Sequence, residues 1–98
     1  MSLAIAFRRA SRAEFLEAAA RYETQRPNLG AEFIGEVERC ITLAAEQPQL
    51  YAVVHKDSRR VTARRFPYSI YFRAERHRIV VLAVFHGSRD PRLWRSRG

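Results

Sequence analysis

The apolar residues of the first quarter of the chain change from alternating to helical spacing. From position 3 to 7 they alternate with small or polar residues, which is typical of a short, half-buried β-strand. Ser11 and Glu14 then have the spacing of a capping box, in which each side chain satisfies the other residue's backbone amide. Helical spacing continues to Arg26, because Pro27 disfavours a helical conformation in the residue before it. The pattern predicts a strand followed by a helix.

A second helix is predicted from Gly30 to Glu46. Its apolar residues recur every three or four positions and form one broad stripe, made of Phe33, Ile34, Val37, Cys40, Ile41 and Ala44. Pro48 ends this helix. Because only a few residues separate it from the first helix, the two should form an antiparallel hairpin.

Three strands are predicted in the second half of the chain, over residues 59–66, 68–73 and 79–85. In the first two strands apolar and polar residues alternate. The third consists of seven consecutive apolar residues, which favours burial on both faces and a central place in the sheet. Their short links predict an antiparallel meander. The basic tail, residues 91–98, is expected to be flexible unless Trp94 docks on the domain.

This order of elements predicts one α+β domain over residues 1–98. The 98 residues suffice for one core, since a chain of this size buries roughly 65% of its unfolded surface. The expected architecture has two layers in the order β-α-α-β-β-β, with a helical hairpin packed on a small, mainly antiparallel sheet. The place of the first strand in that sheet does not follow from the pattern.

Charge is distributed unevenly along the chain. Its 18 basic and 10 acidic residues give a net charge of +8, and all the basic residues except Lys56 are arginines. Residues 1–49 hold six basic and seven acidic side chains, whereas residues 50–98 hold twelve basic and three acidic ones. The second half, at +9, therefore predicts an anionic partner, either nucleic acid or an acidic protein segment.

Several classes of protein do not fit the sequence. No apolar run approaches the ~20 residues of a membrane span, and no signal-peptide pattern is present, so we expect a cytoplasmic protein without a membrane partner. The three histidines do not have metal-ligand spacing, and Cys40 falls within an apolar stripe. With no glycine-rich phosphate loop either, we expect neither a metal nor a cofactor.

The predicted sheet should display arginines on the face opposite the helices. Arg60 and Arg64 point to this face, next to Tyr71 and Arg73 of the neighbouring strand. An arginine side chain is a planar fork that matches phosphate or carboxylate, and tyrosine adds a surface for stacking. This face is predicted to bind RNA or an acidic peptide.

Residues 64–72 (RRFPYSIYF) and 81–91 (VLAVFHGSRDP) resemble the RelE/ParE superfamily of bacterial type II toxins. The similarity extends over nearly the whole chain and includes Tyr22-Glu23 and the turn from Pro27 to Gly30. It implies a compact helical hairpin on a small sheet. It also implies a cognate antitoxin, usually encoded beside the toxin, whose acidic, amphipathic C-terminal segment wraps around it.

The resemblance implies one of two activities. RelE-like members cleave mRNA in the ribosome, and ParE-like members poison DNA gyrase without catalytic residues of their own. Nuclease members commonly carry an arginine after the tyrosine that matches Tyr68, where this chain has Ser69, which supplies no charge to a phosphate. If the chain were a nuclease, the candidates would be His86 as acid with Arg65 and Arg89 on the phosphate. The Phe-Pro-Tyr turn and the His-x-x-Arg-Asp ending favour the ParE-like group often described as plasmid stabilisation proteins.

The leading hypothesis is therefore a ParE-like toxin that inhibits growth by binding a target such as DNA gyrase and is neutralised by an antitoxin. The alternative is a ribosome-dependent mRNA endoribonuclease, so whether the chain is an enzyme stays open, with binding favoured. A weaker reading is an antitoxin-bound repressor partner that has lost its toxicity. A homodimer or a toxin–antitoxin heterotetramer would fit either activity. The surface predicted to bind antitoxin or target consists of Arg60, Arg64, Arg65, Tyr71, Arg73 and Arg89.

Overall fold

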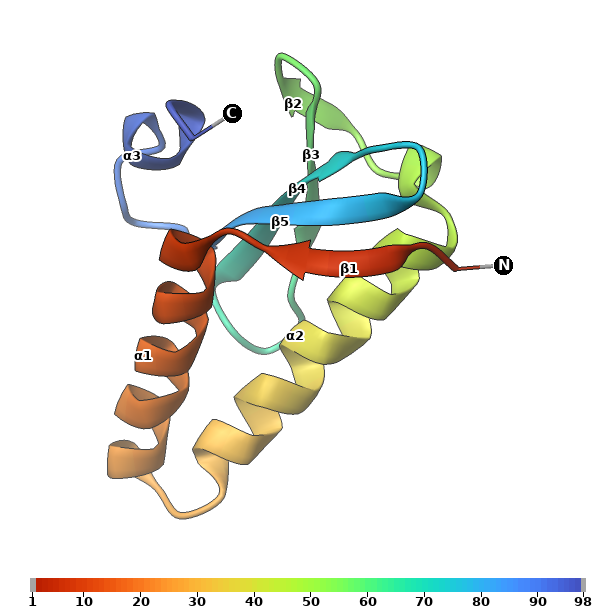
Figure 1. Cartoon of the computed structure of the whole chain (residues 1–98). Coiled ribbons are helices and arrows are strands. Elements are labelled where there is room, and N and C mark those ends of the chain that lie inside the picture. The colour runs from red at the N-terminus through yellow and green to blue at the C-terminus, as the bar shows by residue number, and fades with distance from the viewer. Residues whose placement is uncertain (1, 98) are drawn as a thin grey trace.

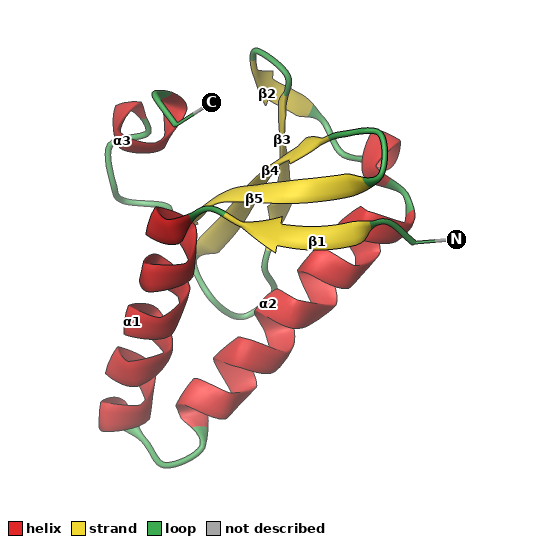
Figure 2. Ribbon diagram, in the orientation of Figure 1, coloured by secondary structure: helices red, strands yellow, loops and turns green. Residues whose placement is uncertain are grey.

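A helical hairpin covers one face of a five-stranded sheet in the computed structural model, which describes residues 2–97 (Figure 1). The two layers are also clear when helices and strands are coloured separately (Figure 2). The predicted α+β class is therefore confirmed. In chain order the elements are β1 (Ala4–Phe7), α1 (Arg9–Gln25), α2 (Leu29–Glu46), a 3₁₀ turn (Pro48–Leu50), β2 (Val53–His55), β3 (Ser58–Thr62), β4 (Tyr68–Ala74), β5 (Arg78–His86) and α3 (Arg92–Arg95).

The strands lie in the order β1-β5-β4-β3-β2. β3, β4 and β5 form the predicted antiparallel meander, β2 adds a further antiparallel strand beside β3, and β5 has a strand on each side, as its apolar run indicates. The place of β1, which the sequence pattern left open, is beside β5 and parallel to it, with Ala4 opposite Arg78 and Phe7 opposite Val81. Parallel neighbours need a long crossover connection, and here the helical hairpin is part of that connection.

Two strand predictions need correction. The strand expected over residues 59–66 ends at Thr62, and the chain then turns through a loop before β4. Arg65 has a φ of 71° in this loop, a left-handed conformation that an extended strand cannot contain. The pattern also missed β2, a three-residue strand whose pairing with β3 is irregular between Val53 and His55.

The predicted capping box at the start of the first helix is wrong. Helix α1 begins at Arg9, so Ser11 lies inside its first turn and is completely buried. The Ser11 hydroxyl lies 2.8 Å from two carbonyl oxygens, those of Arg8 and Val81, and can donate its one proton to either. Its contact with Val81 ties α1 to β5. Ser11 therefore links the helical layer to the sheet and does not cap the helix.

Aromatic rings fill the space between the hairpin and the sheet. The ring of Phe33, fully buried on α2, lies 5.0–5.3 Å from those of Tyr22, Phe66 and Tyr68. These contacts join both helices to β4 and to the loop that precedes it. The predicted apolar stripe of α2 is confirmed, since its central residues are buried in this core. Within residues 2–97, no helix is long and apolar enough to cross a membrane.

Candidate functional site

The sheet face opposite the helices brings together two of the residues predicted to form a binding surface. Arg60 on β3 pairs with Tyr71 on β4, so their side chains lie on the same face, as the alternation indicated. Arg73 lies one pleat further along β4, but its side chain is only 16% exposed and forms an ion pair with Glu75 at 3.0 Å. Arg60 is thus more exposed than Arg73, the other arginine predicted to bind through this face.

Trp94, which sequence reasoning did not include in the site, covers part of this face. Its ring stacks on Tyr71 with 4.0 Å between ring centroids, and His55 of β2 contacts it edge-on. The side chain is almost completely buried, and its indole nitrogen has no hydrogen-bond partner among residues 2–97. The sequence predicted a flexible tail unless Trp94 docks on the domain. Trp94 does dock, and residues 92–95 form the short helix α3. The signal for this was the lone tryptophan in a predominantly basic tail.

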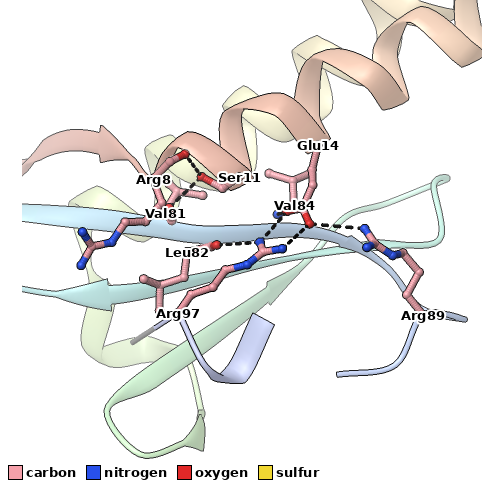
Figure 3. A network of polar contacts seen from close by, with 8 residues as sticks. All are labelled: Arg8, Ser11, Glu14, Val81, Leu82, Val84, Arg89 and Arg97. Carbon is pink, nitrogen blue, oxygen red and sulfur yellow. Dashed lines mark hydrogen bonds and ion pairs between the residues drawn. The ribbon is translucent and has the colours of Figure 1, made fainter. Parts of the chain in front are cut away.

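Glu14 connects this C-terminal segment to the helical layer (Figure 3). Its carboxylate accepts hydrogen bonds from both terminal nitrogens of Arg97, each at 2.9 Å, and one from the backbone amide of Val84 at 3.1 Å. Arg97 also donates to the carbonyl of Leu82. Arg89 reaches the same carboxylate at 3.3 Å and lies over the ring of Phe85. This network fixes residues 84–97 against α1.

The loop with Arg64 and Arg65 is held by α2 and does not continue the basic face of the sheet. Glu36 accepts a hydrogen bond from the backbone amide of Arg64 at 2.6 Å and forms two more with the Arg39 guanidinium. Chiefly because of Arg39, the pKa of Glu36 is lowered from 4.5 to about 2. Arg65 pairs with Glu32 at 2.7 Å. Both loop arginines stay exposed, but on a different part of the molecule from Arg60.

A polar cleft of about 350 Å³ lies between the C-terminal half of α1 and the ends of β4 and β5. It contains His86 and Arg89, two of the three residues considered for a nuclease, but Arg65 does not line it. Helix α1 contributes residues that the sequence reasoning missed. The side chains relevant to its chemistry are Arg21, Tyr22, Gln25, Tyr68, His86 and Arg89.

The hydrogen bonds of His86 determine which of its ring nitrogens carries the proton. The backbone amide of Ser88 donates to Nδ1 at 3.0 Å, and the Ser88 hydroxyl lies 2.8 Å from the same nitrogen. A backbone N–H is always a donor, so Nδ1 must be an acceptor and the proton of the ring is on Nε2. The ring nitrogen that His86 can offer as a donor is therefore Nε2.

A second hollow, which sequence reasoning did not anticipate, lies where β1, α1 and α2 meet. This apolar groove has a volume of about 530 Å³ and borders on β1, an edge strand. Ile5 and Leu16 are 44% and 53% exposed there, although both are large and apolar. Its lining also includes Phe7, Phe15, Ile41 and Thr42, together with two charged residues, Arg12 and Glu38.

Comparisons with known proteins agree with this geometry. Residues 5–91 match the family model described as "ParE toxin of type II toxin-antitoxin system, parDE". Among solved structures, one titled "Chromosomal ParDE TA system from P. aeruginosa" matches with a TM-score of 0.75 and 16% sequence identity, covering 87% of this chain and 96% of that chain. No curated protein sequence matches. Since the family model spans most of the chain, the protein belongs to the ParE toxin family of type II toxin–antitoxin systems.

Proposed function

We propose that the protein inhibits growth by binding a cellular target without cleaving it, and that a cognate antitoxin neutralises it. The observation that carries this proposal is the separation of the nuclease candidates, since His86 and Arg89 line the polar cleft and Arg65 does not. Arg65, in the loop before β4, is instead paired with Glu32 of α2. Ser69 supplies no cation in place of the nucleases' arginine.

We infer that the target is DNA gyrase, because ParE-like members of the superfamily that this sequence resembles poison that enzyme. A cytoplasmic location follows from such a target. Purified protein is expected to inhibit supercoiling by gyrase, and its induction in cells should slow growth and elicit DNA-damage signalling. Primer extension on cellular mRNA should show no codon-phased cuts, even in a Ser69→Arg variant. Codon-phased cuts by the wild-type protein would instead establish the endoribonuclease alternative.

For the antitoxin we propose a docking site in the apolar groove beside β1. An amphipathic segment could place its apolar side against Ile5 and Leu16 and its acidic side near Arg12, which lines the same groove. The outer edge of β1 is not paired within the described sheet and offers backbone groups to an added strand. The exposed arginines, Arg60 among them, would attract an acidic segment from a distance.

A matched pair of substitutions tests this site. Leu16→Glu places a charge in the groove and is expected to weaken binding of the antitoxin encoded beside the gene at least about tenfold. Leu50→Glu makes the same change at a residue that is 69% exposed and lies outside the groove, so affinity should stay the same. Equal affinities of both variants, measured by calorimetry, would show that the antitoxin binds elsewhere.

A further inference from the structure

The polar cleft between α1 and the ends of β4 and β5 has the properties of a small-molecule site. Its volume of about 350 Å³ lies within the range of roughly 300–1,000 Å³ that is usual for such sites, and far exceeds the space that one ion needs. A smaller recess lined by Arg21, Tyr68, His86 and Arg89 continues it towards Glu14. The cleft plays no part in the proposed antitoxin site, which lies where the hairpin meets β1.

Hydrogen-bond donors converge on this cleft. Arg21 donates from Nη2 to the hydroxyl of Tyr68 at 3.2 Å, and its guanidinium pairs with no carboxylate among residues 2–97. Because Tyr68 accepts this bond, its own hydroxyl proton is available to another acceptor. His86 contributes the N–H at Nε2. Burial, together with the nearby Tyr68, raises the pKa of Tyr22, so this hydroxyl also remains a donor at neutral pH.

The charges around the cleft favour an anion. Arg21 and Arg89 line it, and Arg97 stands behind it against Glu14. Two carboxylates face the recess, but that of Glu14 is occupied by Arg97, Arg89 and the backbone of β5, while Glu17 is exposed at the rim. The described lining of the cleft itself thus holds two guanidinium groups and no carboxylate, next to several neutral donors. Such a set matches the tetrahedral oxygens of a phosphate.

We propose that this cleft binds a nucleotide, with Arg21, His86 and Arg89 on the phosphate oxygens. The space beyond the phosphate is bordered by Tyr22 and Gln25. An aromatic ring can stack against a base, and a side-chain amide can both donate to and accept from its polar edge. The cleft is larger than a phosphate ion needs, and Tyr22 and Gln25 could contact a base. For these two reasons we favour a nucleotide over a bare phosphate ion as the ligand.

The proposal predicts saturable binding of adenosine 5′-monophosphate to the purified protein, measured by calorimetry. Binding should be tighter than that of inorganic phosphate or of adenosine alone, since only the nucleotide fills both parts of the cleft. In NMR spectra, AMP should shift the imidazole signals of His86 and leave those of His77, an exposed residue in the β4–β5 turn, unchanged. A dinucleotide that binds more tightly than AMP would identify the ligand as part of a nucleic-acid strand, and weaker binding would identify a free nucleotide.

Matched variants separate a specific site from general attraction to a basic protein. Arg21→Gln should weaken AMP binding about tenfold or more, because it removes a charged donor and replaces it with a shorter, neutral amide. Arg21→Lys should lie in between. Arg76→Gln, which removes the same charge from an exposed position in the β4–β5 turn, should have no effect. Equal losses in both glutamine variants, no saturation with AMP, or equal affinity for AMP and inorganic phosphate would overturn the proposal, while leaving antitoxin and gyrase binding untouched.

Discussion

At the scale of single residues, Glu36 connects three parts of the chain through one carboxylate. It holds Arg39 on its own helix, the amide of Arg64 in the β3–β4 loop, and the thiol of the buried Cys40 at 3.6 Å. Burial and this carboxylate raise the pKa of Cys40 to about 11, so the thiol remains protonated at neutral pH. The loop that presents Arg64 and Arg65 therefore depends on an ionised Glu36.

The lowered pKa of Glu36 predicts a specific loss of stability in acid. Because its folded pKa of about 2 lies below the ordinary 4.5, the ionised carboxylate stabilises the fold fully above pH 4.5 and progressively less as the pH falls towards 2. Glu36→Gln should therefore be less stable than wild type in urea unfolding at pH 7, with a difference that shrinks by pH 3. The exposed Glu38→Gln is the control and should follow the wild-type curve. A constant difference at every pH would mean that Glu36 acts through its shape alone.

At the scale of elements, the first turn of α2 requires a glycine for close packing against α1. A Cβ on Gly30 would lie 2.6 Å from the backbone oxygen of Ala19 and 2.9 Å from Oε1 of Glu23. Glu23 in turn accepts hydrogen bonds from the amides of Asn28 and Gly30, both at 3.0 Å, and so satisfies the start of α2. The close approach of the two helices leaves no room for a side chain.

Two glycine substitutions in α2 are expected to have opposite effects on stability. Gly30→Ala should lower the free energy of unfolding by about 1–3 kcal/mol, because a backbone atom of α1 must move. Gly35→Ala, where the new Cβ would meet nothing within 4 Å, should raise it by about 0.5–1 kcal/mol through helix propensity. Chemical denaturation measures both values. A stable Gly30→Ala variant would mean that the hairpin is less tightly packed than described.

Element boundaries also show where local patterns were insufficient. The alternation from Arg59 to Phe66 predicted one strand, but β3 ends at Thr62. Val61 and Ala63 are both buried in the core that faces the helices, so their apolar character does not show where the strand ends. The hydrogen bond from the Arg64 amide to Glu36 and the left-handed Arg65 end the strand. Glu36 lies 28 residues earlier in the chain, so no local pattern contains this contact.

At the scale of the whole molecule, the C-terminal segment crosses from the sheet face to the helical layer. Trp94 is buried against Tyr71, and Arg97 reaches Glu14 on α1 (Figure 3). The segment thereby covers part of the face on which Arg60 and Tyr71 were predicted to bind a partner. The unpaired indole N–H reduces the net gain from docking, since an unsatisfied buried donor costs about 1–3 kcal/mol.

Fluorescence of Trp94, the only tryptophan, should report the docking of this segment. Wild-type emission should be that of a buried indole and resist quenching by acrylamide. Arg97→Gln, which breaks the ion pair with Glu14, should red-shift the emission and increase quenching, with a smaller effect on global unfolding. Arg76→Gln, at an exposed position in the β4–β5 turn, is the control for loss of charge. Unchanged quenching in Arg97→Gln would show that Trp94 alone holds the tail.

The sequence by itself determined the class of fold, the helical hairpin and the central strand. Hydrophobic periodicity reports which side of each element is buried, and the continuous run from Ile79 to Phe85 therefore identified β5. The shared face of Arg60 and Tyr71 was also predictable, because side chains alternate along paired strands. The order of local motifs was enough to show the resemblance to the ParE family, and the family match confirms that resemblance.

Tertiary structure alone decided the features that depend on contacts distant in the chain. The parallel place of β1, the docking of Trp94 and the pairing of Glu14 with Arg97 each join residues more than twenty positions apart. The polar cleft likewise requires α1 to bring Arg21 to Tyr68, and the proton on His86 is assigned by a hydrogen bond within a turn. Periodicity is a local property, whereas burial, charge pairing and cavities arise only when distant segments pack together.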